Sequence, residues 1–241
     1  MSITLRRPAS LAAATKIVAG LALAGLLSSC GVAGTAFHPG VAAAVGEEQV
    51  KISEVDTIAA GYCSAIEGQL SGQSLPNRFL RGGVVGQLAL VSAARQLAEE
   101  YDVTPGQAYD QQVADLKTAT LTLDPAEQEA VLAIESSGAY ITGVQSAVGT
   151  EVLRRGGTSD PEPDAAAAAG QALFAAWLDD NDVRIDPQYG VAITGGQVVP
   201  VDTSVSTAVG ETAVLGQSEP NPSDPEYAAY TAGLPKSLRC G

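Results

Sequence analysis

The feature that most constrains the fold is a run of helix-like segments between residues 53 and 181, framed on both sides by short β-prone segments. Apolar side chains in this run recur three, four and seven positions apart, which is the spacing of one helix face. Residues 41–52 before the run and residues 183–193 after it have the apolar, β-branched pattern of short strands. Strands at both ends of a helical domain can meet in one small sheet. The sequence therefore predicts an α+β fold that is mainly α.

Capping residues divide the run into separate helices. Ser53 with Asp56, Thr104 before Pro105, and Asp124 are typical helix starts, and the last also has an acid at the third position of the helix. Glycine and basic residues mark the ends. The predicted helices span residues 53–68, 77–101, 104–118, 124–155 and 160–181.

The chain after Pro200 is rich in Ser, Thr, Pro, Gly and acidic residues and has no sustained apolar period. Such a composition favours an extended or disordered segment. We therefore predict a helical domain at residues 41–193, whose N-terminal hairpin and returning strands form one small sheet, followed by an extended tail at residues 194–241.

The first 29 residues have the three parts of a secretory signal. Arg6, Arg7 and Lys16 make a basic start without any acid, the small residues Ser28 and Ser29 form the cleavage site, and the apolar run Ile17–Leu27 lies between these two parts. This run is shorter than the roughly 20 residues that a helix needs to cross a bilayer. We expect residues 1–29 to be a cleaved lipoprotein signal peptide.

Leu27-Ser28-Ser29-Cys30 follows this run directly and resembles the lipobox of bacterial lipoproteins. In those proteins a diacylglyceryl group, with acyl chains such as palmitate, is attached to the cysteine thiol, and cleavage makes this cysteine the first residue. The resemblance implies lipidation at Cys30, anchoring at the extracytoplasmic face of the cell membrane, and a flexible tether at residues 30–40. An ordinary signal peptide with an unrelated cysteine is the alternative.

The net charge of the chain without its leader limits the classes of molecule that it can bind. Removing residues 1–29 from the 241-residue chain removes three of its 13 Lys and Arg residues and none of its 27 Asp and Glu residues, which leaves 212 residues with a net charge of −17. An acidic protein repels the phosphates of nucleic acids, so that class of partner is excluded. The expected partners are the membrane, through the lipid anchor, and exported polypeptides that are unfolded or extended.

Cys63 and Cys240 remain once Cys30 is assigned to the lipid. Two cysteines in an exported protein indicate a disulfide, and two free thiols are the alternative. Their separation excludes a CxxC redox motif and a zinc knuckle.

No residue pattern indicates catalysis, a metal or a cofactor. His38 is the only histidine and lies in the tether, so neither a Ser-His-Asp triad nor a histidine-based metal site has a basis. Asp179, Asp180 and Asp182 lack the ligand alternation of a calcium loop, and an acidic turn at a helix end explains them.

Two phrases resemble a known family. Residues 41–56 are similar to the opening of the N-terminal domain of SurA, of PrsA-type foldase lipoproteins and of related actinobacterial lipoproteins, although Glu47 replaces a frequent glycine of that phrase. Residues 182–190 are similar to the strand that follows the last helix in the actinobacterial members. The matching positions of the first phrase are Val45, Gly46, Val50, Ser53 and Glu54.

This resemblance covers residues 41–193 and implies a helical cradle that holds extended polypeptide in an apolar groove without ATP. A parvulin domain does not fit into the 48 residues after Ile193, so we expect no prolyl isomerase activity. Four aromatic residues are candidates for lining the groove, and packing in the core is the alternative for each of them because each lies on the apolar face of a predicted helix. These residues are Phe79, Tyr101, Phe174 and Trp177.

The sequence thus predicts a non-enzymatic chaperone or polypeptide-binding lipoprotein of the cell envelope. A structural or assembly lipoprotein, which docks one dedicated envelope partner through its acidic surface or its tail, is the alternative from another class. A minimal isomerase or other enzyme is a third hypothesis and requires turnover of a proline peptide.

Overall fold

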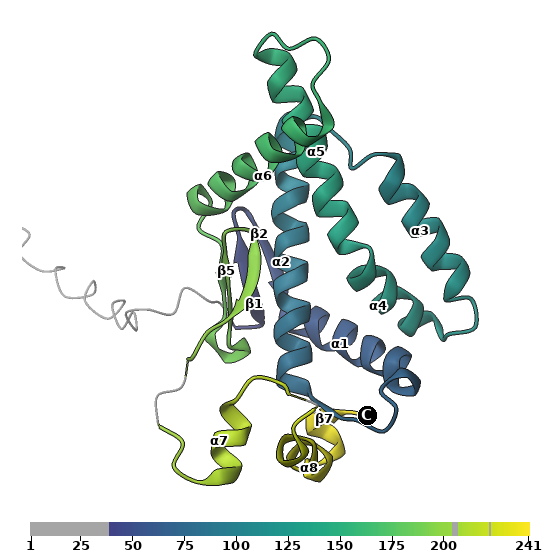
Figure 1. Ribbon diagram of the computed structural model, residues 1–241, viewed down its shortest axis with the longest axis vertical. Helices are drawn as coiled ribbons and strands as arrows, with labels where there is room; N and C mark the ends of the chain where they lie inside the picture. The colour runs from purple at the N-terminus through teal and green to yellow at the C-terminus, as the bar shows by residue number, and fades with distance from the viewer. Residues whose placement is uncertain (1–38, 204–206, 222) are drawn as a thin grey trace, which may run out of the picture. The chain divides into compact units, whose positions relative to one another are not determined.

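The computed structural model describes residues 39–203, 207–221 and 223–241 (Figure 1). The predicted leader, Cys30, His38 and most of the tether lie outside these residues. The helices are α1 (Ile52–Ile66), α2 (Asn77–Tyr101), α3 (Gln107–Ala119), α4 (Pro125–Glu135), α5 (Ser137–Arg155), α6 (Pro163–Asp180), α7 (Glu211–Gln217) and α8 (Pro225–Gly233), with short 3-10 turns η1 (Glu67–Gln69), η2 (Pro187–Tyr189) and η3 (Lys236–Leu238). The strands are β1 (Val41–Val45), β2 (Glu48–Lys51), β3 (Leu75–Pro76), β4 (Arg184–Ile185), β5 (Val191–Thr194), β6 (Gln197–Pro200) and β7 (Arg239–Cys240).

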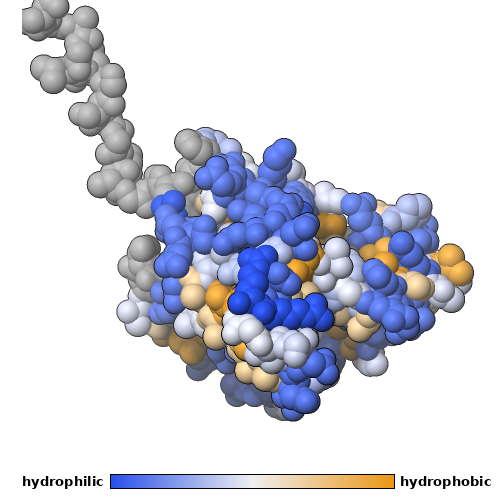
Figure 2. Space-filling model, turned by 90° about the horizontal axis from the view of Figure 1, so that it is seen from above, coloured by the Kyte–Doolittle hydropathy of each residue, from blue (hydrophilic) through white to orange (hydrophobic). Residues whose placement is uncertain are grey.

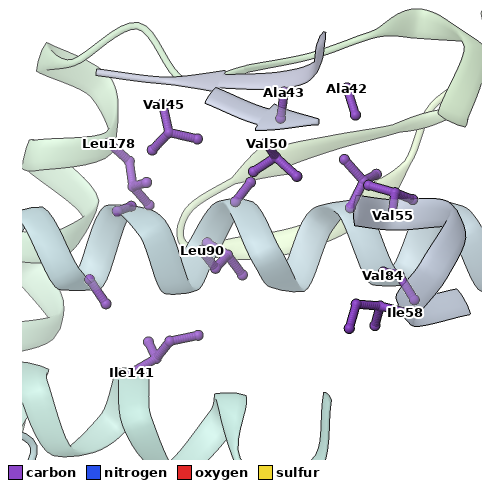
Figure 3. Packing of buried hydrophobic residues seen from close by; sticks show 14 of the residues in the cluster. Ala42, Ala43, Val45, Val50, Val55, Ile58, Val84, Leu90, Ile141 and Leu178 are labelled. Atoms are coloured by element: carbon purple, nitrogen blue, oxygen red, sulfur yellow. The ribbon is translucent and has the colours of Figure 1, made fainter. Parts of the chain in front are cut away.

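Helix α2 is the centre of the packing. It contacts α1, α4, α5 and α6 as well as β1, β2, β5 and β6 (Figure 1). Figure 3 shows Val45 and Val50 of the first hairpin on one side of α2 and Ile141 of α5 on the other, with Leu90 of α2 between them. The described residues form mainly helices together with three small antiparallel sheets, which confirms the α+β, mainly α fold.

The first sheet joins the two ends of the helical run. Its strand order is β2-β1-β4, and Ala43 and Ala44 of β1 pair with Ile185 and Arg184 of β4. The strand directly after the last long helix therefore returns to the N-terminal hairpin, as expected. Strand β5 does not join this sheet. It pairs with β6 across the turn at Gly195 and Gly196, so the hairpin continues past the boundary predicted at residue 193.

Polar contacts fix the first hairpin on α2. The carboxylate of Glu48 accepts hydrogen bonds from Ser92 and Arg95, and Gln96 Nε2 donates to the carbonyl of Val45 at 2.8 Å. Partial burial raises the pKa of Glu48, but the hydrogen bonds from Arg95 and Ser92 outweigh this effect and leave the pKa below its ordinary value. Glu48 therefore stays ionised, and its ion pair with Arg95 attaches the edge strand β2 to α2.

Glycines in α2 allow the second hairpin to lie directly against this helix. A side chain at Gly86 would overlap the side chain of Val198 in β6, and one at Gly82 would approach the carbonyl of Tyr189 at 2.9 Å. The helix-weakening glycines that the sequence shows in α2 are therefore used for close packing. Both are buried.

Helices α5 and α6 also cross at glycines. A side chain at Gly149 would overlap the carbonyl of Ala166, and one at Gly170 would overlap the carbonyl of Gln145. The absence of a Cβ at both positions lets the two backbones meet, and this fixes α5 against the rest of the bundle.

Several predicted helix boundaries were wrong. The third helix begins at Gln107, with Gly106 and not Thr104 at its N-cap, and the last long helix begins at Pro163, with Glu162 and not Asp160 at its N-cap. The first helix begins at Ile52, with Lys51 at the N-cap, and Ser53 lies inside its first turn. The predicted helix at 124–155 is divided at Ser136 into α4 and α5. The hydroxyl of Ser136 donates to the carbonyl of Leu132 at 2.7 Å, and that of Ser137 donates to the carbonyl of Ile134 at 2.6 Å. Such bonds compete with the helix pattern and bend the chain.

The prediction of an extended segment over residues 194–241 was also wrong. The segment contains β6, α7, α8 and β7. Asp224 before Pro225 is a side-chain N-cap, because its carboxylate accepts from the backbone N–H of Glu226 at 2.9 Å. Tyr227 and Thr231 of α8 are buried. The cap and two inward side chains order a helix that composition alone did not predict.

Candidate functional site

A groove of about 920 Å³ lies between α5 and the segment that leads from α2 into α3. The α5 wall consists of small uncharged residues along one face of the helix, and the opposite wall is the backbone and short side chains of residues 102–108. The α5 residues of the central wall are Gly138, Ala139, Thr142, Gly143, Ser146, Ala147 and Thr150. Small side chains on the α5 wall leave room for the backbone of a bound polypeptide.

Local sequence explains how the groove forms. Asp102 ends α2 in the left-handed conformation, with φ 54°, and Gly106 has φ 85° before α3 begins. Between them the carbonyl of Pro105 lies so close to Gly143 that any side chain at this glycine would overlap it. The segment therefore crosses α5 at Gly143 and then departs with α3, which opens the groove.

Charged residues lie at one end of the groove only. Asp102, Glu151 and Arg154 line that end, and the other lining residues carry no charge. Glu151 also forms an ion pair with Arg155 at 2.8 Å. A ligand along the centre of the groove thus meets hydroxyls, methyl groups and backbone, and meets both signs of charge at the end.

A smaller depression of about 310 Å³ lies on the other side of α3. Its aromatic wall is the pair Tyr109 and Tyr140, whose rings meet edge to face at 5.2 Å between centroids. Burial raises the pKa of Tyr140 above its ordinary value. Helix α3 has no fully buried residue and is held here by this ring pair and by a hydrogen bond of 2.8 Å from Gln112 Nε2 to the carbonyl of Glu135.

The structure does not bring the four predicted aromatic residues together. Phe174 is 1% exposed and Trp177 is 9% exposed, and both belong to the core. Phe79 and Tyr101 lie 22 residues apart in α2, which corresponds to about 33 Å along the helix. The guanidinium of Arg78 lies 4.1 Å from the ring centroid of Phe79. No aromatic groove forms from these four residues.

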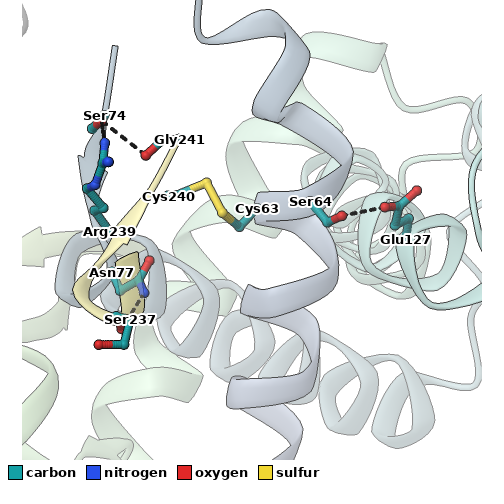
Figure 4. Close-up of a disulfide and its surroundings, with 9 residues drawn as sticks. All are labelled: Cys63, Ser64, Ser74, Asn77, Glu127, Ser237, Arg239, Cys240 and Gly241. Atoms are coloured by element: carbon teal, nitrogen blue, oxygen red, sulfur yellow. Dashed lines mark hydrogen bonds between the residues drawn. A yellow bond between two sulfur atoms is a disulfide. The ribbon is translucent and has the colours of Figure 1, made fainter. Parts of the chain in front are cut away.

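Cys63 and Cys240 form a disulfide between α1 and β7, with their Cα atoms 5.5 Å apart (Figure 4). Strand β7 pairs with β3, and Arg239 donates to Ser74 Oγ at 2.6 Å. Cys240 is fully buried. The bridge and this short strand pair attach the last residues to the helical domain.

In the acidic turn after α6, Asp182 forms an ion pair within the chain. Asp182 pairs with Arg184 at 2.9 Å between the carboxylate and the guanidinium. Within residues 39–203, 207–221 and 223–241 no three His, Cys, Asp or Glu side chains gather in a way that could hold a metal ion. In the same part of the chain no helix is both long and apolar enough to span a membrane.

Sequence reasoning missed the groove because it followed the apolar stripe of α5 and not the small-residue face beside it. Residues 139, 143 and 147 form a four-residue period of Ala, Gly and Ala on that face. This period was the available signal. Small residues at this period indicate that another group packs closely against the helix. They are equally compatible with another helix, a loop or a ligand.

Comparison of the chain with protein-family models, curated proteins and solved structures finds no match. The resemblance to SurA-type domains therefore rests on the two sequence phrases and stays a prediction. What the site can do has to be argued from its own geometry.

Proposed function

We propose that this chain is a lipid-anchored, non-enzymatic protein of the cell envelope that binds extended polypeptide in the groove between α5 and residues 102–108. The observation that carries the proposal is the run of small, uncharged α5 side chains along the centre of a groove of about 920 Å³. Small side chains allow a peptide backbone to approach α5 closely, and the Ser and Thr hydroxyls among them can donate to and accept from its amides.

The length of the groove suits a short extended segment. The lining residues of α5 run from Gly138 to Arg154, which corresponds to about 24 Å of helix, and Pro105 contacts this wall at Gly143. An extended chain advances about 3.3 Å per residue, so about two residues fit between Gly138 and Gly143 and about five between Gly143 and Arg154. Contacts of this kind depend mainly on the backbone of the ligand and favour weak, permissive binding.

The rest of the described surface argues for binding in a groove and not on a broad apolar face. Five large hydrophobic residues are exposed among the described residues, and Leu121, at 72% exposure, is the one that lies in the helical run. Figure 2 shows the molecule from above as mainly hydrophilic, with hydrophobic residues in small separate patches. The exposed apolar patches that mark protein-binding sites are larger than these separate patches.

Peptide binding by the chain from Gly31 onward, which keeps every described residue, tests the proposal. Fluorescent peptides of about ten uncharged residues are titrated and their anisotropy is measured. Thr142→Trp places an indole from an exposed position into the groove and should weaken binding at least tenfold. Ala114→Trp, on the exposed face of α3 outside the groove, is the control and should bind as the wild type does.

Equal binding by Thr142→Trp and the wild type would show that peptides do not occupy this groove. Absence of binding by the wild type, together with no delay in the aggregation of an unfolded secreted protein, would reject the polypeptide-binding function itself.

A second candidate function is docking of one folded envelope partner on the C-terminal segment. The observation that favours it is that four of the five exposed large hydrophobic residues lie between residues 201 and 238. Val209 is 95% exposed and Val214 is 51% exposed. Crosslinking in cells should then yield one stoichiometric partner, and Val209→Ser with Val214→Ser should abolish the crosslink while peptide binding persists.

A further inference from the structure

A second depression, of about 450 Å³, borders the groove on the neighbouring side of α5. We call it the glutamine pocket, because four glutamine side chains from three helices and a strand surround it. They are Gln87 of α2, Gln145 of α5, Gln171 of α6 and Gln197 of β6. The apolar floor is formed by Leu90, Ile141 and Phe174, which are buried core residues.

The amide groups of this pocket are available to a ligand. Gln87 Oε1 lies 3.1 Å from Ser137 Oγ, but the one proton of this hydroxyl goes to the closer carbonyl of Ile134 at 2.6 Å. The side chains of Gln145, Gln171 and Gln197 form no hydrogen bond with the described residues. Each carboxamide offers two donors and one acceptor. Within the described part of the chain no charged residue lines the pocket.

These properties select a neutral polar group. A ligand carboxamide or hydroxyl can exchange hydrogen bonds with the glutamines while its carbon atoms lie on the apolar floor. A carboxylate or an ammonium group would find no opposite charge among the lining residues. The lining therefore suits an uncharged polar group better than a charged one.

The pocket and the groove are adjacent on α5. Gly138 and Thr142 line both of them, and Gly138 has open space where a side chain would be. A chain that lies along the groove can thus extend a side chain across α5 at Gly138 without meeting a large residue. This adjacency favours a polypeptide as the occupant over a separate small ligand.

We propose that the glutamine pocket is a specificity subsite of the peptide groove, which receives the uncharged polar side chain of Gln, Asn, Ser or Thr from an extended segment. This inference rests on the proposed polypeptide-binding function and adds the class of segment that is preferred. The bound segment has a short polar residue or a carboxamide at one position and no charge there.

Peptides that differ at one central position test the inference. The wild-type chain from Gly31 should bind a peptide with Gln at this position five- to tenfold more tightly than the same peptide with Leu, which corresponds to one or two hydrogen bonds. It should bind the peptide with Glu most weakly. The combined variant Gln145→Leu, Gln171→Leu and Gln197→Leu should lose the preference for Gln and keep its affinity for the Leu peptide.

Gln111→Leu is the matched control, because Gln111 is an exposed glutamine on α3 that lines neither the groove nor the pocket. It should keep the preference of the wild type. Circular dichroism shows whether the triple variant is folded. If it is not, the pair Gln171→Leu and Gln197→Leu, both at exposed positions, gives the same readout.

The outcomes separate this inference from the proposed function. Equal affinity of the wild type for the Gln, Leu and Glu peptides, or a preference that survives in the folded triple variant, would overturn the specificity subsite while peptide binding stands. If no peptide binds, both proposals fail. Binding of a neutral oligosaccharide that the triple variant loses, without any peptide binding, would also overturn them and assign the pocket to a sugar.

Discussion

Breaking the disulfide between Cys63 and Cys240 should lower the free energy of unfolding by several kcal/mol. The two residues are 177 positions apart, so the bridge closes most of the described chain into one loop. On the chain-entropy model a loop of this length restricts the unfolded chain by about 5 kcal/mol, which is an upper value. We therefore expect the variant Cys63→Ser with Cys240→Ser to lose roughly 3–5 kcal/mol.

The loss should be concentrated in the C-terminal segment. Without the bridge, this segment keeps the two-residue pairing of β7 with β3, and a hydrogen bond of 3.0 Å from Asn77 Nδ2 to the carbonyl of Ser237 (Figure 4). Single hydrogen bonds of this kind contribute about 1 kcal/mol each. Such contacts do not replace the bridge, so α8 and β7 should be the first elements to unfold.

Urea denaturation followed by circular dichroism measures the change. With a slope of about 2–3 kcal/mol per molar of urea, the midpoint of the double variant should lie lower by about 1.5 M. Ser64→Ala is the control, because it removes the hydroxyl that donates to Glu127 beside Cys63 and leaves the bridge intact. Its cost should not exceed about 1 kcal/mol.

Limited proteolysis of the native variant should cut first after residue 218, and the wild type should resist under the same conditions. An unchanged midpoint in the double variant would refute the reasoning. Alkylation of both thiols in the native, oxidised wild type would refute it as well, because the bridge would then not exist.

Two further predictions concern packing and pH. Gly170→Ala should lower the free energy of unfolding by about 1–3 kcal/mol in urea denaturation, because the added methyl overlaps the carbonyl of Gln145. The control Gly138→Ala places its methyl in open space and should not destabilise the protein. Equal stability of the two variants would contradict the close crossing of α5 and α6. Burial, and then the hydrogen bond and charge of a carboxylate on α4, raise the pKa of Tyr62 from 10.0 to about 12. The folded state thus holds this proton more tightly than the unfolded chain, so its stabilising contribution is complete below pH 10 and is lost between pH 10 and 12. Tyr62→Phe should fall less steeply than the wild type in this window, and parallel curves would count against the assignment.

Local signals in the sequence were sufficient for much of the helical scaffold. Helix α2 has the predicted bounds, Asn77–Tyr101, and its left-handed C-cap at Asp102 ends it. The backbone N–H of Asp124 donates to the carboxylate of Glu127 at 3.1 Å, as the predicted capping box requires. Caps and apolar stripes act within a few residues, and such signals can be read from one sequence.

The errors arose where the apolar pattern and the composition do not decide the structure. Ser136 and Ser137 interrupt a continuous apolar stripe, and only their bonds to preceding carbonyls reveal the bend. Helix α8 lies in a segment whose composition indicates disorder, yet Tyr227 and Thr231 are buried. Whether a few side chains become buried depends on which residues of other segments pack against them. The composition of a segment contains no information on such tertiary contacts.

The candidate site was harder to predict than the fold. The sequence indicated aromatic residues as the lining of a groove, but aromatic side chains are also the best core residues, and Phe174 and Trp177 are in the core. The groove is instead lined by the smallest side chains of α5. Small residues are equally compatible with a helix contact, and α5 shows both uses: Gly149 faces α6, and Gly143 faces the segment before α3.

Reduction of the disulfide can distinguish the two candidate functions, because the two surfaces depend on it differently. The groove is lined by residues 102–154, and none of these lies in α1, β3 or the C-terminal segment that the bridge connects. Peptide binding should therefore be the same before and after reduction, provided that the helical domain remains folded. Val209 and Val214 lie in the C-terminal segment, so docking of a partner there should weaken when the segment is released. Peptide binding that changes on reduction would mean that the C-terminal segment reaches or controls the groove, and the groove would then not act as an independent site.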